Sequence, residues 1–387
     1  MAITVNKLYK NGISPYHFSI VAGNKGLSNF VTWVHVVEDS MASKFIRGGE
    51  IVITTGIARL SEEELLQFTK DLYSNGASAF VINTGEYIKS IPQSIIDYCN
   101  FVNMPLFTIP WQVKLVDVTR DFCNKIIQEE VIENTITSTM KNILFDVGDK
   151  TSNIHQMERY GYKKDCHMRF VCLNIPNLND GRFDEKMEFL TRCAEHTAKE
   201  IQDQYIKFKY NSMLIIILTE YTENFTELFI NNFISYCHIN QALKNIHIGV
   251  SSNTKGLLNQ KDNMNKAIEA CKLATKQNKE IMYYDKMKEY KILLAVKDID
   301  ILKEYYNEIL GKIEEYDRNN STELLEFLEV YIKNNCSVQK VSEALYIHRN
   351  TVNNQLKKIE KITDCNMSDI ETKTKCCLAF YIRDILK

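Results

Sequence analysis

The sequence lacks the features that mark secreted, membrane-spanning and metal-binding proteins. Its eleven cysteines are dispersed over 387 residues without a C-x-x-C pair, and no signal-peptide core follows Met1. The longest apolar stretches, such as Met213 to Leu218, fall far short of the roughly 20 residues that span a bilayer. We therefore expect a cytoplasmic protein that does not associate with membranes, and cysteines that are small buried thiols.

The sequence contains few glycines and prolines and no catalytic signature. These absences exclude further classes of protein. Five prolines and fourteen glycines exclude collagen-like and low-complexity proteins. No G-x-S-x-G, Walker-type or H-E-x-x-H pattern occurs, so we expect no catalytic residue, no metal and no cofactor. With a net charge of −2 and 45% apolar residues, the chain should fold as several domains, and any nucleic-acid contact must be local.

The most informative segment, Ser337 to Thr363, contains two short amphipathic helices joined by a tight turn. Two apolar stripes recur at helical spacing and can bury against each other. They consist of Val338, Val341, Ala344 and Leu345 and, after Ile347 in the turn, of Val352, Leu356, Ile359 and Ile362. This pattern predicts a helix-turn-helix that binds double-stranded DNA.

The polar side of these helices carries side chains that can bond base edges and phosphates. The candidate DNA-binding residues are Ser337, Gln339, His348, Arg349, Asn350, Thr351, Asn353, Asn354, Gln355, Lys357 and Lys358. The alternative is an ordinary two-helix corner with a solvated face. From Ser337 to Ile362, however, five basic residues stand against two acidic ones, a net +3 in a chain of net charge −2. This local excess favours DNA binding.

Residues 31 to 111 alternate strand and helix patterns, which predicts a mainly parallel sheet with right-handed crossovers. The expected strands are Val31 to Val37, Ile51 to Thr55, Ala79 to Asn83 and Leu106 to Ile109, and the expected helices are Glu62 to Tyr73 and Pro92 to Phe101. Ligands of such sheets usually bind beyond the carboxyl ends of the strands. Here these ends carry Thr54 to Gly56, Thr84-Gly85 and Pro110-Trp111.

A small-molecule effector is therefore expected in this first domain. The candidate effector-binding residues are Arg47, Gly48, Gly49, Glu50, Thr54, Thr55, Gly56 and Trp111. Arg47 to Glu50 has two interpretations, a turn before a strand or glycines that let a small anion or urea-like group approach the backbone. Trp111 either covers a core or stacks on a planar heterocycle.

Two further regions connect the ends of the chain. Lys114 to about Asp146 predicts one long amphipathic helix, which serves as a core helix or as a connector and dimer contact. Within residues 167 to 290, the pattern predicts strands at Arg169 to Ile175, Ile206 to Tyr210, Met213 to Leu218 and Ile246 to Ser251, with helices at Phe183 to Gln202, Thr226 to Ile239 and Asn259 to Lys276.

We also expect a homodimer or a higher homo-oligomer, because regulators that bind two half-sites need a symmetric contact.

Tyr346 to Val352 closely resembles the hydrophobic-H-R-N-T-hydrophobic signature of the PucR-type helix-turn-helix. Lys358 to Thr363 and Thr374 to Leu386 resemble its continuation and closing helix. Asn353, Asn354 and Gln355 depart from the arginine or tyrosine of many members, so the resemblance implies DNA binding but no particular operator.

Most of residues 8 to 125 resemble the PucR amino-terminal domain. The resemblance rests on Val34-His35-Val36, Glu38, Arg47 to Glu50, Thr54 to Gly56, Gly76-Ala77, Pro105-Leu106 and Pro110-Trp111. It implies a sensory domain, linked in some members to purine-breakdown metabolites.

The middle region resembles the degenerate GGDEF-like domain of the same family, through Gly249 to Ser251, Ala267 to Ala270 and Tyr284. An active nucleotide cyclase is the competing hypothesis. It needs carboxylates for Mg²⁺ and a glycine-rich hairpin, whereas this chain has Asn174 and Tyr210-Asn211-Ser212-Met213. A protein-interaction adaptor is a third alternative.

Together these patterns predict a multidomain fold, α/β plus all-α. We expect a PucR-like sensory α/β domain with a mainly parallel sheet at 1–125, a helical connector at 126–165, a degenerate GGDEF-like α+β domain at 166–295, a linker helix at 296–320 and a helix-turn-helix domain at 321–387. The expected function is a transcription regulator, most simply an activator, that binds double-stranded DNA and a small metabolite of purine, ureide or amino-acid catabolism.

Overall fold

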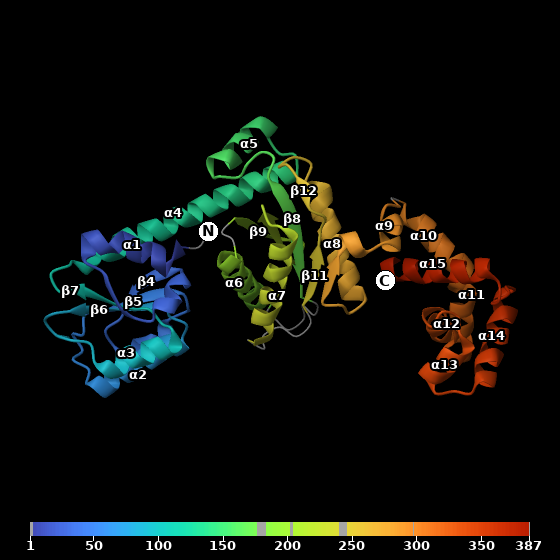
Figure 1. The fold of residues 1–387 in the computed structure, drawn as a ribbon, viewed down its shortest axis with the longest axis horizontal. Helices are drawn as coiled ribbons and strands as arrows, with labels where there is room; N and C mark the ends of the chain where they lie inside the picture. The colour runs from blue at the N-terminus through green and yellow to red at the C-terminus, as the bar shows by residue number, and fades with distance from the viewer. Residues whose placement is uncertain (1–2, 176–182, 202–203, 240–245, 297, 387) are drawn as a thin grey trace. The chain divides into compact units, whose positions relative to one another are not determined.

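The computed structural model describes residues 3–175, 183–201, 204–239, 246–296 and 298–386. It is a mixed α/β protein with a helical carboxyl-terminal region (Figure 1). The chain divides into two compact units. The first comprises residues 1–164, 188–206 and 222–236, and the second comprises residues 165–187, 207–221 and 237–387.

The first unit contains a five-stranded sheet in the order β2-β7-β6-β5-β4. Its strands are β2 (Ser19–Ala22), β4 (Trp33–Val36), β5 (Glu50–Thr54), β6 (Ala79–Thr84) and β7 (Leu106–Pro110). Strands β4 to β7 are parallel, which confirms the predicted sheet, and β2 adds an antiparallel edge. A separate pair joins β1 (Ile3–Thr4) to β3 (Phe30–Val31).

Helices cover both faces of this sheet (Figure 1). They are α1 (Val5–Tyr16), α2 (Glu62–Ser74) and α3 (Gln93–Val102), with short 3-10 turns η1 (Asn24–Ser28) and η2 (Ser40–Phe45). Because successive strand residues face opposite sides, Phe107 joins one core with Phe122, and Phe80 joins the other with Phe68. Because β5 is buried on both faces, its sequence contains the unbroken apolar run Ile51 to Ile53.

The predicted connector is α4 (Leu115–Leu144), a helix of 30 residues that extends about 45 Å at 1.5 Å per residue. Its first half buries Val118, Phe122 and Ile126 in the core of the amino-terminal sheet. Its second half contacts α5 (Lys150–Arg159). Between these two contacts the helix leaves Ile127 and Val131 exposed. The helix is therefore anchored at both ends, with an apolar stretch open between them.

A six-stranded sheet occupies the middle of the chain, in the order β13-β11-β8-β10-β9 with β12 paired to β8. The strands are β8 (His167–Asn174), β9 (Tyr205–Tyr210), β10 (Met213–Thr219), β11 (His247–Val250), β12 (Thr254–Lys255) and β13 (Ile281–Tyr283), and the helices are α6 (Phe183–Ile201), α7 (Glu223–Ile239) and α8 (Lys261–Lys276). The predicted elements of this region are confirmed, although Gln202, the predicted end of the first helix, lies outside the described residues.

Two local backbone features explain the tight hairpin of this middle sheet and the close packing of α8 against it. Asn211 and Ser212 between β9 and β10 have φ of 46° and 63°, the left-handed pair that a two-residue hairpin turn requires. On β11, a Cβ at Gly249 would lie 2.1 Å from the Ala267 carbonyl oxygen of α8. Only glycine lets this helix approach the strand so closely.

The carboxyl-terminal region is helical. It contains η3 (Tyr284–Lys286), α9 (Glu289–Leu294), α10 (Ile299–Tyr306), the π turn η4 (Asn307–Gly311), α11 (Lys312–Asn320), α12 (Leu324–Lys333), α13 (Val338–Leu345), α14 (Arg349–Thr363) and α15 (Ile370–Leu386). Residues 296–320 were expected to form a linker, yet Leu310 and Ile313 are fully buried in the same core as Val341 and Val352. These helices are part of the helix-turn-helix core.

Asp317 joins α11 to α12. Its carboxylate accepts hydrogen bonds from the Thr322 hydroxyl at 2.6 Å and from the Leu324 and Leu325 amides at 2.9 and 2.8 Å. We expect Asp317→Ala to destabilise this corner by about 1–2 kcal/mol, because two amides of the first turn of α12 lose their acceptor. Faster hydrogen exchange in α12 checks this, with Asp317→Asn giving a smaller change. Unaltered exchange in both variants would contradict it.

Candidate nucleic-acid interface and effector site

The turn between α13 and α14 is held by hydrogen bonds to side chains. The Ser337 hydroxyl accepts from the Lys340 amide at 3.4 Å and begins α13. The His348 Nδ1 accepts from the Asn350 amide at 3.2 Å and begins α14. The Ser342 hydroxyl donates to the Ile347 carbonyl at 2.5 Å. Two of the predicted DNA-binding residues, Ser337 and His348, are thus helix caps.

The buried side of α14 is formed by Val352, Leu356 and Ile359, as predicted. The opposite side is exposed and polar. Of the candidate DNA-binding residues, the exposed ones are Gln339, His348, Arg349, Asn350, Thr351, Asn353, Asn354 and Lys357. At 100° per residue, Asn350 and Asn354, followed by Lys357, are the exposed candidates that lie most nearly opposite the buried stripe. The structure therefore brings amide and ammonium groups to one face, which suits base edges and phosphates.

Gln355 and Lys358 face a different direction. Both line a cleft of about 480 Å³ whose walls include Leu324 and Phe327 of α12, and both are only partly exposed. The Lys358 ammonium lies 4.8 Å from the centre of the Tyr316 ring, a cation–π contact. Lys358 therefore contacts α11, and Gln355 lines the cleft beside α12, so these two candidates lie on a different side of α14 from Asn350 and Asn354.

Tyr346 was not among the predicted site residues. It ends α13 in the left-handed conformation, with φ of 54°, and 94% of its surface is exposed. An exposed phenol beside the start of α14 can donate to a phosphate oxygen. Tyr346 entered the sequence-based prediction only as the start of the family signature, but its position in the turn, next to the candidate residues of α14, could have identified it.

In the amino-terminal domain, the ends of the parallel strands meet at one edge of the sheet. Thr54 pairs with Ile82, and Thr84 pairs with Pro110. Glu38, which follows β4, accepts hydrogen bonds from the Thr54 hydroxyl at 2.9 Å and from the Thr55 amide at 2.9 and 3.1 Å. Glu38 was not a candidate effector-binding residue, although it lies at a strand end as Thr54 and Trp111 do.

Aromatic side chains border the same edge. The Trp111 ring, with 39% of its surface exposed, lies 5.3 Å from the Tyr87 ring at 82°. The Arg59 guanidinium carbon lies 5.8 Å from the centre of that tyrosine ring. The Trp111 amide donates to the Thr84 carbonyl at 2.8 Å. The edge thus combines an indole, a phenol, a guanidinium and a carboxylate, which can hold a planar polar molecule.

Arg47 to Glu50 lies at the opposite edge, where β5 begins. The buried Glu50 carboxylate accepts from the Arg47 amide at 2.9 Å and from the Gly48 amide at 2.8 Å. Gly48 and Gly49 have φ of 100° and 87°, which the turn requires. The structure does not bring these residues near Thr54 to Gly56, and the hydrogen bonds favour the turn interpretation over a ligand site.

The polar and thiol side chains that were considered for catalysis form contacts within the fold. The Asn174 amide nitrogen at the end of β8 donates to the Thr275 hydroxyl of α8 at 3.2 Å. Within the described ranges, no group of three or more histidine, cysteine or acidic side chains is arranged to hold a metal ion. Burial raises the pKa of the Cys99 thiol to about 12 and of the Cys376 thiol to about 11, so both stay protonated at neutral pH.

No helix in the described part of the chain is at once long and apolar enough to cross a membrane. The same cysteines that were expected to be small buried thiols are mostly buried: Cys99, Cys166, Cys172, Cys193, Cys237, Cys271 and Cys376. Cys365 is exposed.

Two family models match the chain, one towards each end. The purine catabolism regulatory protein-like family matches residues 8–126, and the PucR C-terminal helix-turn-helix domain matches residues 324–382. Both segments thus match models of PucR-type regulators. The PucR helix-turn-helix match includes the exposed face of α14, and the match to the amino-terminal family includes Glu38, Thr55 and Trp111.

Three proteins of Bacillus subtilis (strain 168) are similar to parts of the chain. The proline-responsive transcriptional activator PutR is 33% identical over 153 residues, 39% of this chain and 37% of that protein. The purine catabolism regulatory protein is 26% identical over 179 residues, 44% of this chain and 33% of that protein. The DNA-binding transcriptional activator AdeR is 33% identical over 91 residues, 22% of each. Each match spans well under half of the relative's length.

Among solved structures, the crystal structure of the regulator of polyketide synthase expression from Bifidobacterium adolescentis aligns with 66% of this chain and 92% of that chain. The sequence identity is 14% and the TM-score is 0.31. A TM-score of this size does not establish a shared arrangement of the whole chain.

Proposed function

We propose that this chain is a DNA-binding transcription regulator whose activity responds to a small metabolite. The observation that carries the proposal is the helix-turn-helix, in which α14 exposes Asn350, Asn354 and Lys357 on the side opposite its buried stripe. The local net charge of +3 from Ser337 to Ile362 supports contact with phosphates. Two of the relatives are named as transcriptional activators, which supports activation and action in the cytoplasm.

Selection of bound fragments from a random DNA library tests this proposal. The full chain should enrich a defined sequence, and its affinity for that sequence should exceed its affinity for unrelated DNA by at least about a thousandfold at physiological salt. A two-fold symmetric site with half-sites about 34–36 Å apart would support the proposed homodimer. Enrichment of no sequence would exclude specific DNA binding and leave the protein-interaction adaptor as the better account.

For the middle domain we propose a degenerate GGDEF-like module that acts as a spacer. Support comes from its largely antiparallel sheet, from Asn174 at the end of β8 and from the two-residue hairpin at Asn211 and Ser212. A neutral amide does not offset the charge of Mg²⁺ as a carboxylate does. Incubation with nucleoside triphosphates and Mg²⁺ or Mn²⁺ should yield no cyclic product, and turnover that depends on this domain would overturn the assignment.

For the effector we propose a small, polar, planar molecule at the edge formed by Glu38, Thr55 and Trp111. The relatives are named for proline and for purine catabolism, so a thermal-shift screen should begin with proline, purines and ureides. A ligand at 100 times its dissociation constant raises stability by about 2.7 kcal/mol. The alternative binding site for the effector is Arg47 to Glu50, at the other edge of the sheet.

We expect Thr55→Val to weaken the binding of the effector found in that screen by about 1–3 kcal/mol, because a ligand group buried against the hydroxyl loses its partner. In this structure the Thr55 hydroxyl accepts only a local bond from the Ile57 amide at 3.3 Å. Calorimetric titration measures the effect. Thr119→Val is the matched control, since its hydroxyl bonds to carbonyls of its own helix. Equal effector affinity in wild type and Thr55→Val would remove this edge from consideration.

A further inference from the structure

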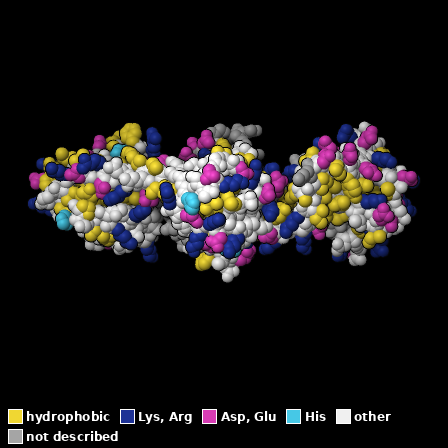
Figure 2. All heavy atoms as spheres, turned by 90° about the horizontal axis from the view of Figure 1, so that it is seen from above, with side chains coloured by type: hydrophobic (Ala, Val, Ile, Leu, Met, Phe, Trp, Pro, Cys, Tyr) yellow, Lys and Arg dark blue, Asp and Glu magenta, His cyan; other side chains and the backbone are white. Residues whose placement is uncertain are grey.

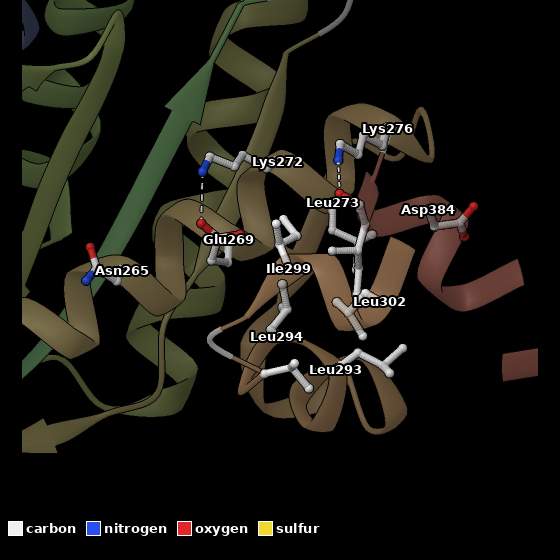
Figure 3. A pocket seen from close by; sticks show the side chains of 12 residues that line it. Asn265, Glu269, Lys272, Leu273, Lys276, Leu293, Leu294, Ile299, Leu302 and Asp384 are labelled. Atoms are coloured by element: carbon white, nitrogen blue, oxygen red, sulfur yellow. Dashed lines mark hydrogen bonds and ion pairs between the residues drawn. The ribbon is translucent and has the colours of Figure 1, made fainter. Parts of the chain in front are cut away.

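A second cavity lies within the second unit and shares no lining residue with the cleft beside α14. It has a volume of about 540 Å³ and lies between α8 on one side and α9, α10 and the end of α15 on the other (Figure 3). Cavities of roughly 300–1,000 Å³ accommodate small organic ligands. None of the residues that line it belongs to the two segments matched to PucR models; Asp384 and Ile385 lie just beyond the second segment, which ends at residue 382.

The cavity has an apolar floor and a charged rim. Leu273, Leu294, Ile299 and Leu302 point into the space between the helices (Figure 3). Figure 2 shows hydrophobic side chains gathered on the surface of the carboxyl-terminal region. Ile292, Ile299 and Ile301 of α9 and α10 are exposed. The apolar floor therefore continues into an apolar rim on one side, which an apolar ligand body can cover.

Two lysines stand one turn apart on the α8 side. Lys272 is paired with Glu269 at 2.9 Å, whereas Lys276 donates to the Ile385 carbonyl at 2.5 Å, a neutral acceptor (Figure 3). Burial lowers the pKa of Lys276, and the like charge of Lys272 adds to this, whereas the carboxylates of Glu269 and Asp384 act in the opposite direction. An ammonium group has three N–H donors, so Lys276 has hydrogen-bond capacity and positive charge for a bound anion.

The acidic groups of the lining are already engaged. Asp384 Oδ2 accepts hydrogen bonds from the Tyr290 hydroxyl at 2.7 Å and from the Gln277 side chain at 3.3 Å. Gln277 also donates to the Tyr290 hydroxyl at 2.7 Å. Glu269 is paired with Lys272 and Asp384 accepts from these neutral donors, so Lys276 is the lysine of this lining whose bonded partner is a carbonyl and not a carboxylate. These bonds also hold the end of α15 against α8 and define the cavity walls.

We propose that this cavity is a binding site for a small amphipathic carboxylate, a molecule with one anionic head and an aliphatic or aromatic body. The carboxylate lies at Lys276, and the body covers Leu294, Ile299 and Leu302. The anion gives the Lys276 ammonium an opposite charge, and burial of the body removes apolar surface from water. A dianion or a sugar fits less well, because the floor offers it no polar partner.

Occupation of the cavity bridges the middle domain and the helix-turn-helix domain. Its walls include α15, which also contacts α12 through the ion pair of Arg383 with Glu329 at 2.6 Å. A ligand that holds α15 against α8 thereby restrains the DNA-binding helices relative to the middle domain. This consequence for DNA affinity rests on the proposed function, whereas ligand binding itself does not.

Calorimetric titration of the full chain with octanoate, in the absence of DNA, tests the site. Octanoate should bind with a measurable heat, and 1-octanol, which has the same body without the charge, should bind at least about tenfold more weakly. Lys276→Gln should weaken octanoate binding by about tenfold. Glutamine keeps N–H donors for the Ile385 carbonyl and removes only the charge. Ile299→Ser should weaken binding of both probes, since it removes part of the apolar floor.

Lys303→Gln is the matched control. Lys303 is paired with Asp300 on α10 at 2.8 Å, as Lys272 is with Glu269, but it does not line the cavity. Its octanoate affinity should equal that of wild type. No binding of octanoate, equal affinity of octanoate and octanol, or equal octanoate affinity in wild type and Lys276→Gln would each overturn the proposal. Failure of the chain to bind DNA would leave it standing.

Discussion

Asn350→Ala and Asn354→Ala are each expected to weaken binding to the selected DNA sequence by about 1–3 kcal/mol, because a side-chain amide that bonds a base edge discriminates by that amount. Both side chains point away from the buried stripe of α14 and are exposed. Binding to unrelated DNA should change little. Fluorescence anisotropy with selected and unrelated duplexes at matched salt measures the difference.

Two further variants separate base contacts from phosphate contacts. Lys357→Ala should weaken binding to all duplexes and reduce the slope of log affinity against log salt by about one. Gln355→Ala should change specific affinity little, because Gln355 is directed into the cleft beside α12. Unchanged affinity in the asparagine variants together with Lys357→Ala would remove the proposed DNA-binding face. A large loss in Gln355→Ala alone would place the contact on the other side of α14.

Phe122→Ala is expected to destabilise the amino-terminal domain by about 3–5 kcal/mol, the usual cost of removing a fully buried aromatic side chain and leaving a cavity. Phe122 on α4 is completely buried, with its ring centre 5.5 Å from Phe18 and 6.2 Å from Tyr16. The substitution therefore removes the anchor between the long helix and the sheet. Hydrogen exchange of the full chain should accelerate in α1, β7 and the first half of α4.

Val116→Ala on the same helix is the control, since 67% of Val116 is exposed and surface substitutions usually change stability by within about 0.5 kcal/mol. The carboxyl-terminal helices should keep their protection in both variants. If Phe122→Ala left the exchange of β7 unchanged, the amino-terminal core would not depend on this helix, and the role of α4 as an anchored connector would be wrong.

The secondary structure of the PucR-like domain was predictable because its patterns are local. The alternation of strands and helices from 31 to 111 predicted four strands within two residues of β4 to β7, since side-chain periodicity and turn residues depend on near neighbours. The same holds for α13 and α14. Strand β2 was not predicted, because a segment of only four residues becomes a strand by pairing with β7.

Site geometry was less predictable. The rule that parallel strand ends share an edge correctly grouped Thr54, Thr84 and Pro110. It could not show that Glu38 bonds Thr54 and Thr55, or that Arg59 and Tyr87 border Trp111. Such contacts join residues far apart in the chain, and their formation depends on loop paths that local propensity does not determine.

By itself, then, the sequence determined most helices and strands of residues 31–111 and 167–276, the buried side of α14, and a helix-turn-helix with a local positive charge. These properties follow from periodicity and composition. Only the tertiary structure decided that Arg47 to Glu50 lies at the far edge from Thr55, that Gln355 and Lys358 face α12 and α11, and that Lys276 meets the end of α15. The physical reason is that packing and hydrogen bonding between distant segments set side-chain direction, and one sequence position carries no information about its distant neighbour.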